Sequence, residues 1–202
     1  MKMTRFEKTF VNSRSHSDRV AAAIALRIAR IEPRRGERCL DVGCGNGAAA
    51  VHLADRFGLD VTGVDIDPDQ IRLAEARRGD RNDVRFRIAD ATALPFAYGT
   101  FDVAVSNKTL HHVADWPRAL REIARVARPG GLVVFADLMV PRWIATALGL
   151  VRQGAVPATA ASLRAVAAGA GLLPVAERQA GGTFSATWRK GGSFVERSPR
   201  PA

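Results

Sequence analysis

Short apolar runs alternate with helical patterns along most of this chain. Five of the runs read as buried strands, at residues 40–42, 59–65, 84–88, 101–106 and 132–137. The stretches between them either place apolar side chains at helical spacing or form loops marked by Pro and Gly. Strands that alternate with helices are typical of an α/β fold built on a parallel sheet.

A leading amphipathic helix is predicted at residues 18–31, where apolar residues recur every three or four positions. Its apolar face is modest and rich in Ala, which favours a cover over the sheet rather than a helix that lies on a membrane. Phe6 and Phe10 precede it in a segment without a clear period. We expect that segment to act as a lid over the site.

Two internal helices carry recognisable start signals. Asp67 reads as the N-cap of one, with Pro68 in its first turn and Gln70 as its third-position partner. Asp115 reads as the N-cap of the other, which we expect to stop at the Pro-Gly-Gly of residues 129–131.

The pattern loosens after the fifth strand. We expect short helices at residues 143–151 and 158–168, and then a hairpin of residues 172–178 and 183–189 around Gly181-Gly182. The last ten residues contain two prolines and little to bury, which predicts a frayed tail.

The stretch LDVGCGNGAAA at residues 40–50 describes a strand, a turn that requires glycine, and a helix start with small residues. Such a turn suits a nucleotide-like cofactor. Its spacing is GxGxG rather than the GxGxxG of dinucleotide enzymes, and Asp41 precedes it where it would repel a pyrophosphate. S-adenosylmethionine has no phosphate and carries a sulfonium and an ammonium, so it tolerates that carboxylate.

A second acidic residue supports this interpretation. The strand at residues 59–65 ends on Asp65, which lies 24 residues after Asp41, near the distance at which an acid binds ribose hydroxyls.

These motifs together resemble the class I S-adenosylmethionine-dependent methyltransferases of the small-molecule type, similar to methyltransferase domain 11. Four stretches carry the resemblance: LDVGCGNG, VTGVDIDPDQI, VRFRIADATALPFAYGTFDVAVSN and ALREIARVARPGGLVVFADL. The resemblance implies a Rossmann-like three-layer sandwich with a seven-stranded, mostly parallel sheet whose last strand is antiparallel. It also implies S-adenosyl-L-methionine as the cofactor and methyl transfer as the activity.

The resemblance assigns residues to the cofactor site. Asp65 is implied as the ribose ligand, Ile66 lies beside the adenine, and Asp90 contacts the adenine amino group with Ala91 as its backbone neighbour. The full predicted set is Asp41, Gly43, Cys44, Gly45, Asn46, Gly47, Asp65, Ile66, Asp90, Ala91 and Asn107.

A chain of 202 residues fits one domain. We expect a single methyltransferase domain at residues 1–190, with a lid and helix at 1–38, the cofactor-binding core at 39–138, and C-terminal helices and a hairpin at 139–190. Residues 191–202 form the predicted tail.

The residues that could act on the methyl acceptor lie just after the fourth predicted strand. His111 and His112 can act as bases or contact the substrate, and a local packing role is the alternative. The sequence Asn-Lys-Thr-Leu at residues 107–110 departs from the Asn/Asp-Pro-Pro-aromatic motif of the DNA- and glutamine-methylating enzymes. We therefore expect a small-molecule or lipid-like acceptor, methylated at O, N or C, and no specific nucleic acid.

The net charge of +10 is unevenly distributed. Residues 1–38 carry +6 (ten basic, four acidic), residues 39–140 carry −2 (twelve basic, fourteen acidic) and residues 141–202 carry +6 (eight basic, two acidic). An anionic substrate or a peripheral membrane contact would use such basic flanks. Because 26 of the 30 basic residues are Arg, compositional bias is the simpler alternative.

The remaining features predict a cytoplasmic protein without a metal site. The chain has no run of 18 apolar residues and no secretion signal at its start. No second cluster of Cys or His residues accompanies Cys39 and Cys44 to complete a metal site, so we expect both cysteines to be packing residues. Two other functions stay open: a binding protein that holds the cofactor without catalysis, and an RNA or DNA methyltransferase that uses the basic flanks.

Overall fold

A computed structural model describes residues 14–139 and 158–192, with side chains from residue 20 onward. The predicted lid with Phe6 and Phe10, the predicted helix at residues 143–151 and the predicted tail from residue 193 lie outside the described residues. The hairpin and the five preceding strands lie within them.

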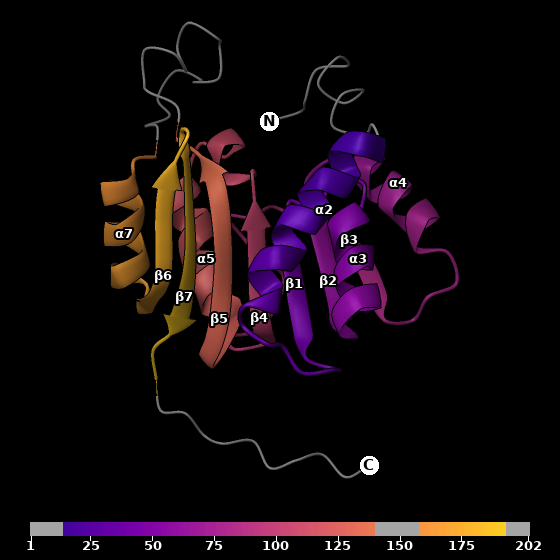
Figure 1. Cartoon of the computed structure of the whole chain (residues 1–202), viewed down its shortest axis with the longest axis horizontal. Coiled ribbons are helices and arrows are strands. Elements are labelled where there is room, and N and C mark those ends of the chain that lie inside the picture. The colour runs from indigo at the N-terminus through magenta and orange to yellow at the C-terminus, as the bar shows by residue number, and fades with distance from the viewer. Residues whose placement is uncertain (1–13, 140–157, 193–202) are drawn as a thin grey trace, which may run out of the picture.

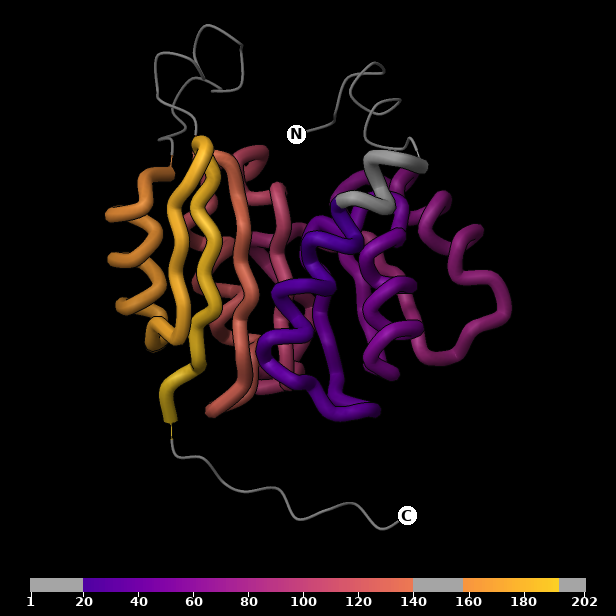
Figure 2. Tube along the Cα trace, in the orientation of Figure 1, coloured from indigo at the N-terminus to yellow at the C-terminus, as the bar shows by residue number. Residues whose placement is uncertain are grey.

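One seven-stranded sheet forms the middle of the molecule (Figures 1 and 2), in the order β3-β2-β1-β4-β5-β7-β6. Its strands are β1 (Arg38–Val42), β2 (Asp60–Asp65), β3 (Val84–Ile88), β4 (Phe101–Asn107), β5 (Ala127–Leu138), β6 (Leu172–Ala180) and β7 (Thr183–Lys190). The pairs among β1 to β5 are parallel, whereas β7 is antiparallel to both β5 and β6. The predicted sheet and its antiparallel last strand are confirmed.

Helices cover both faces of this sheet and make three layers. They are α2 (Arg14–Ala29), α3 (Ala48–Phe57), α4 (Pro68–Arg78), α5 (Trp116–Val126) and α7 (Ala160–Gly169), with the 3-10 helix η1 (Leu110–His112) after β4. In Figure 1, α2 and α3 lie in front of the strands and α5 lies behind them.

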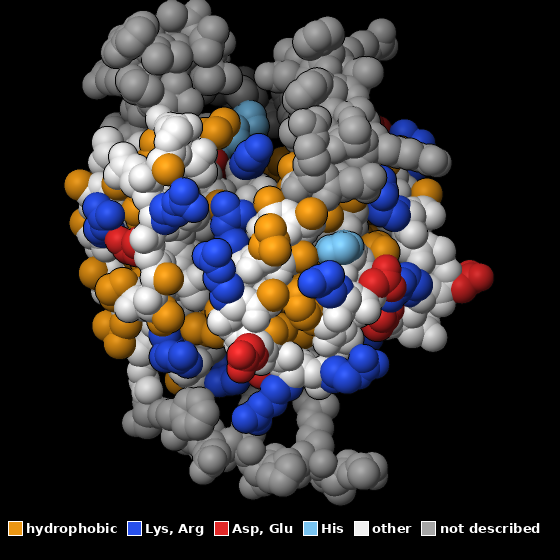
Figure 3. Space-filling view, viewed as in Figure 1, with side chains coloured by type: hydrophobic (Ala, Val, Ile, Leu, Met, Phe, Trp, Pro, Cys, Tyr) orange, Lys and Arg blue, Asp and Glu red, His pale blue; other side chains and the backbone are white. Residues whose placement is uncertain are grey.

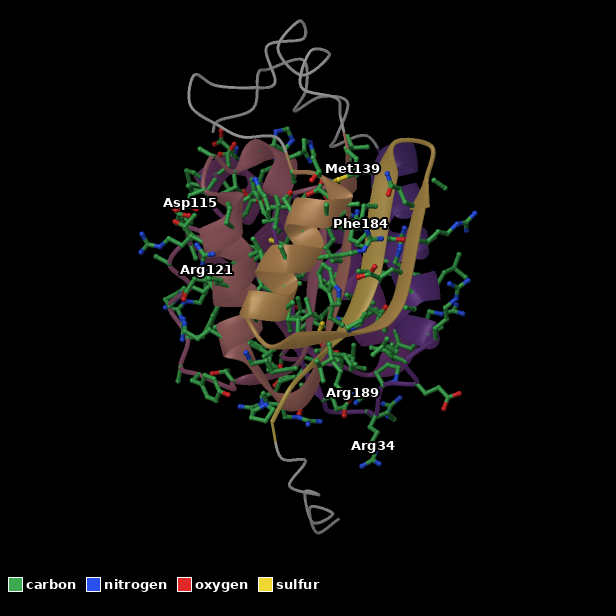
Figure 4. The ribbon with its side chains drawn as sticks, turned by 90° about the vertical axis from the view of Figure 1, so that its left-hand side faces the viewer. Arg34, Asp115, Arg121, Met139, Phe184 and Arg189 are labelled. Atoms are coloured by element: carbon green, nitrogen blue, oxygen red, sulfur yellow. The ribbon has the colours of Figure 1, made fainter. Side chains whose placement is uncertain are left out.

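Each face has its own core. Ile28 of α2 and Leu53 of α3 pack with Val61 of the sheet on one face. On the other face Ile123 of α5 and Leu163 of α7 belong to a cluster that contains the three aromatic rings of Phe135, Phe184 and Trp188. Figure 4 shows Phe184 where α7 lies against the strands. Burial of apolar surface on both faces stabilises the sheet between its helices. The strand ends are not covered in this way and remain available for a binding site.

Helix capping agrees with the sequence at two of three points. The Asp67 side chain accepts a hydrogen bond from the Asp69 backbone N–H, and Asp115 accepts one from Arg118. The prediction that Gln70 completes the first cap is wrong, because its side chain is buried in the core and makes no hydrogen bond there.

The prediction that residues 129–131 stop α5 is also wrong. The helix already ends at Val126, and these residues form the beginning of β5. A Cβ at Gly131 would lie 2.9 Å from the backbone oxygens of both Arg128 and Asp102. The glycine therefore permits close approach of β5 to β4 rather than ending the helix.

The surface is basic without a single concentrated patch in the view of Figure 3. Lys and Arg side chains are scattered over that face among apolar and neutral residues, and acidic side chains are fewer. Within residues 14–139 and 158–192, no helix is long and apolar enough to cross a membrane.

Asp102 links three adjacent strands at one end of the sheet. Its Oδ2 accepts a hydrogen bond from the backbone N–H of Arg38 on β1 at 2.8 Å, and its Oδ1 accepts one from Nε of Arg128 on β5 at 2.7 Å. The Asp102 side chain is only 6% exposed.

We predict that Asp102→Asn lowers the free energy of unfolding by about 3 kcal/mol, because it removes the nearer of two charged partners of the largely buried Arg128 guanidinium and leaves only Glu37, at 4.0 Å. Urea denaturation followed by circular dichroism measures the change. Asp80→Asn, at an exposed position, serves as the control. Equal stability of the two variants would show that the Asp102 ion pair contributes nothing.

Candidate functional site

A cavity of about 660 Å³ opens at the carboxyl ends of the parallel strands. It is lined mainly by residues that follow β1, β2, β3 and β4, because these ends meet at one edge of the sheet. Val20 and Ile24 of α2 and Leu138 of β5 complete the lining within the described residues. Of the predicted site residues, all line this cavity except Gly47.

The glycine turn after β1 uses its three glycines for different reasons. All three have positive φ: 75° at Gly43, 52° at Gly45 and 76° at Gly47. A Cβ at Gly43 would lie 2.2 Å from Oγ1 of Thr109, and one at Gly47 would lie 2.5 Å from the Phe86 ring. Those two glycines are required by packing within the protein.

Gly45 is different, because a Cβ there meets only the Gln70 side chain, at 3.7 Å. The space in front of Gly45 therefore belongs to the cavity and not to a neighbouring side chain. This is the position where a ligand can approach the backbone.

Asp65 holds the glycine turn in place. Its Oδ2 accepts a hydrogen bond from the Gly45 N–H at 3.0 Å and its Oδ1 accepts one from the Asp67 N–H at 2.9 Å. Burial raises the pKa of Asp65, and the two backbone donors oppose that rise. Each carboxylate oxygen keeps a second lone pair for a ligand such as a ribose diol.

Asp41 is a buried acid at the end of β1. Its side chain is 3% exposed, and its Oδ2 has no hydrogen-bond partner among the described residues. Burial, and then the nearby Asp65 charge, raise the pKa of Asp41 to about 7. A carboxyl group in this state is a preformed partner for a bound cation.

Cys44 and Cys39 are free, buried thiols. Burial raises the pKa of both, so neither has the low pKa of a reactive cysteine. Their predicted packing role agrees with their positions in the core around α3.

Two further segments bring polar and apolar groups to the cavity. Asp90 is exposed there, with Oδ1 accepting hydrogen bonds from the Thr92 N–H and Oγ1, both at 2.8 Å. Ile66 is 51% exposed and lines the same cavity as Ala91. An apolar surface beside a carboxylate suits a purine ring with an amino group.

On the other side of the cavity, His111 pairs with an acid that the sequence analysis missed. Nδ1 of His111 lies 2.5 Å from Oδ1 of Asp137, and the His111 backbone N–H donates to Oδ2 of the same carboxylate at 3.2 Å. Asp137 is 2% exposed at the end of β5. The His112 ring packs against the His111 ring at a tilt of 42°, with centroids 3.9 Å apart. The sequence did contain a signal for Asp137, because it is an acidic residue at the end of a predicted strand, as Asp41 and Asp65 are.

Comparison with known proteins decides the family. A profile described as a methyltransferase domain matches residues 40–135. The chain is 41% identical over 113 residues to O-methyltransferase cnsE of Penicillium expansum. The matched region covers 54% of this chain and 41% of that relative. It is 40% identical over 129 residues to 27-O-demethylrifamycin SV methyltransferase of Amycolatopsis mediterranei. That match covers 62% of this chain and 45% of the relative.

Residues 40–135 therefore form a methyltransferase domain. In fold, the chain is similar to the PH0226 protein of Pyrococcus horikoshii OT3, with a TM-score of 0.77, 22% identity, and coverage of 94% of this chain and 100% of that one. The chain spans less than half of the length of the two curated relatives.

The cavity of the methyltransferase fits the family's cofactor, S-adenosylmethionine. The glycine cradle leaves room at Gly45, Asp41 presents an unpartnered buried oxygen, and Asp65 offers acceptors at the end of β2. These groups suit a ligand with an ammonium, a sulfonium and a ribose diol, and the two carboxylates would repel a phosphate.

We predict that Gly45→Val weakens S-adenosylmethionine binding by about two orders of magnitude, or about 2.7 kcal/mol, while the protein still folds. A Cβ at this position points into the ligand space and meets no protein atom closer than Oε1 of Gln70, at 3.7 Å. Calorimetric titration with circular dichroism tests this. Gly36→Val is the matched control, because Gly36 also has positive φ and open space around its Cβ position. Normal binding by Gly45→Val would exclude this turn from the ligand contact.

A second prediction concerns pH. Because the Asp41 pKa rises from 3.8 to about 7 on folding, its contribution to stability is complete below about pH 4 and is lost as the pH rises through about 7. The melting temperature of the ligand-free protein should therefore fall more steeply over this range in the wild type than in Asp41→Asn. Parallel curves for the wild type and Asp41→Asn would show that Asp41 titrates normally.

Proposed function

We propose that this protein transfers the methyl group of S-adenosylmethionine to a hydroxyl group of a small molecule, with His111 as the general base. The single observation that carries this proposal is the pair of His111 and the buried Asp137 in the wall of the cavity. The name of one curated relative, O-methyltransferase cnsE, and that of the other, 27-O-demethylrifamycin SV methyltransferase, both refer to an oxygen position and support the choice of oxygen.

The pair defines which nitrogen of His111 holds a proton. A buried carboxylate only accepts, so Nδ1 donates to Asp137 and neutral His111 keeps its lone pair on Nε2. A hydroxyl group is a weak nucleophile until it loses its proton, whereas a neutral amine is nucleophilic without deprotonation. A fixed base is therefore most useful for an oxygen acceptor.

The cofactor supplies the methyl group and its own leaving group. The protein binds and orients the reactants: Asp65 binds the ribose hydroxyls, Asp41 faces the positive charge, and Asp90 with Ile66 and Ala91 holds the adenine. Cys44, Asn46 and Asn107 complete the cofactor side, and the apolar residues Val20, Ile24 and Leu138 exclude water near the acceptor.

Acceptors of moderate size and mixed polarity suit this cavity. Val113 and Leu138 offer apolar surface, and Lys108 with the two histidines offers polar groups. The basic surface in Figure 3 has no concentrated patch on the face shown, which favours a small molecule over a nucleic acid. A cytoplasmic location remains our prediction.

The test is turnover. Purified protein is incubated with S-adenosylmethionine and a panel of phenols, sugar alcohols and amines, and S-adenosylhomocysteine is detected. With a hydroxyl acceptor, His111→Ala should lower kcat by about 10² to 10⁴, the usual contribution of a general base, and leave cofactor affinity unchanged. Asp137→Asn should lower kcat in the same direction.

His52→Ala, on α3 and outside the cavity lining, is the matched control. Full turnover by His111→Ala would show that methyl transfer needs no base here. Cofactor binding without turnover of any acceptor would favour a protein that holds the cofactor without catalysis. Steeply salt-dependent binding of RNA with RNA methylation would favour the nucleic-acid alternative.

A further inference from the structure

The segment between β3 and β4 carries Asp90 without the support of a helix or strand. After Asp90 the chain makes a turn, closed by the Ala93 N–H bonded to the Asp90 carbonyl at 3.0 Å. The Leu94 side chain then enters the core under α5, where it is 4% exposed. We call residues 89–100 the adenine segment, since it holds the proposed adenine contacts.

One ion pair on α5 anchors this segment by its backbone. The Leu94 N–H donates to Oε2 of Glu122 at 2.9 Å, and Nη2 of Arg125 donates to the Leu94 carbonyl at 3.0 Å. Nη1 of Arg125 donates to the Phe96 carbonyl at 2.8 Å. The Arg125 carbonyl also accepts a hydrogen bond from the Gly99 N–H at 3.1 Å.

The two anchoring side chains fix each other. Arg125 binds Glu122 through two hydrogen bonds, Nε to Oε1 at 2.6 Å and Nη2 to Oε2 at 2.8 Å. Their side chains are 35% and 19% exposed, so water weakens the pair only in part. The hydrogen bond to Arg125 lowers the pKa of Glu122, which stays ionised. The guanidinium donates all four of these side-chain hydrogen bonds at once, whereas a lysine ammonium has only three N–H donors.

Asp90 lies in the part of the segment that lines the cavity. Thr92 occupies its Oδ1 with two hydrogen bonds, so the direction of Oδ2 depends on where the backbone of residues 90–94 lies. That position is set four residues later, at Leu94, by Glu122 and Arg125.

We propose that Glu122 and Arg125 are positioning residues that make the site select a 6-aminopurine, because they hold the adenine segment so that Asp90 accepts from the adenine amino group. Asp90 would repel the oxygen of a 6-oxopurine in the same place. This inference rests on the proposed cofactor site and adds to it a pair of residues that do not line the cavity.

The experiment compares two cofactor products that differ at one position of the purine. S-adenosylhomocysteine and S-inosylhomocysteine, in which an oxo group replaces the 6-amino group, are titrated by calorimetry into the full-length protein. The variants are Arg125→Met and Arg121→Met. Arg121 is exposed on the same helix (Figure 4), and its side chain makes no hydrogen bond to the described part of the chain, so it is the matched control.

We expect the wild type and Arg121→Met to prefer S-adenosylhomocysteine to the same degree. Arg125→Met should weaken S-adenosylhomocysteine about tenfold, the lower end expected for loss of a charged hydrogen bond, and should weaken S-inosylhomocysteine less. The ratio of the two affinities is the deciding value, since general destabilisation lowers both alike. In an Asp90→Asn background, Arg125→Met should no longer change that ratio.

Each other outcome has a defined meaning. If the ratio of the two affinities in Arg125→Met equals that of the wild type, whether both affinities fall equally or neither falls, the inference is overturned. Equal binding of both compounds by the wild type overturns it too, while the proposed function stands. No binding of S-adenosylhomocysteine by the wild type would instead reject the proposed function. If Arg125→Met fails to fold, Glu122→Gln, which keeps the acceptor for Leu94 and loses the charge, replaces it in the same comparison.

Discussion

The close contact between Gly43 and Thr109 is the constraint on which the site depends. A side chain at Gly43 would lie 2.2 Å from Oγ1 of Thr109, and that hydroxyl donates to the Val42 carbonyl at 3.1 Å. The turn after β1 and the turn after β4 are therefore locked to each other. One turn carries the cofactor cradle and the other leads into η1 with His111, so this single contact sets the distance between the two halves of the chemistry.

The electrostatics of the cavity follow from the same arrangement. Asp41 and Asp65 come from neighbouring parallel strands, and burial raises the pKa of both. Two acids so close in a dry site are unfavourable in the ligand-free protein and become favourable when a cation binds. The acceptor side uses a different device: a buried Asp137 that orients one histidine. In the proposed mechanism, charge recognition and proton removal therefore lie on opposite sides of one cavity.

Stability and function lie at opposite ends of the sheet. At the amino ends of the strands, Asp102 connects β1, β4 and β5 through Arg38 and Arg128. At the carboxyl ends, Oδ2 of Asp41 and both side-chain amide atoms of Gln70 have no hydrogen-bond partner within the described residues. Of these two residues, Asp41 lines the cavity, where a ligand can bind its free oxygen.

The sequence by itself determined the strands, the glycine turn, Asp41, Asp65 and the family resemblance. These features are local. Glycine spacing, a carboxylate at a strand end and apolar periodicity each depend on residues close together in the sequence, so they can be recognised without a structure. The sequence was misleading at Gln70 and at residues 129–131, where local capping rules competed with burial and with the approach of β5 to β4. Only the tertiary structure decided the different roles of Gly43 and Gly45, the pairing of His111 with Asp137, and the anchoring of the adenine segment by Arg125. Those contacts join residues 26 to 67 positions apart, and only the packed sheet and helices bring their atoms together.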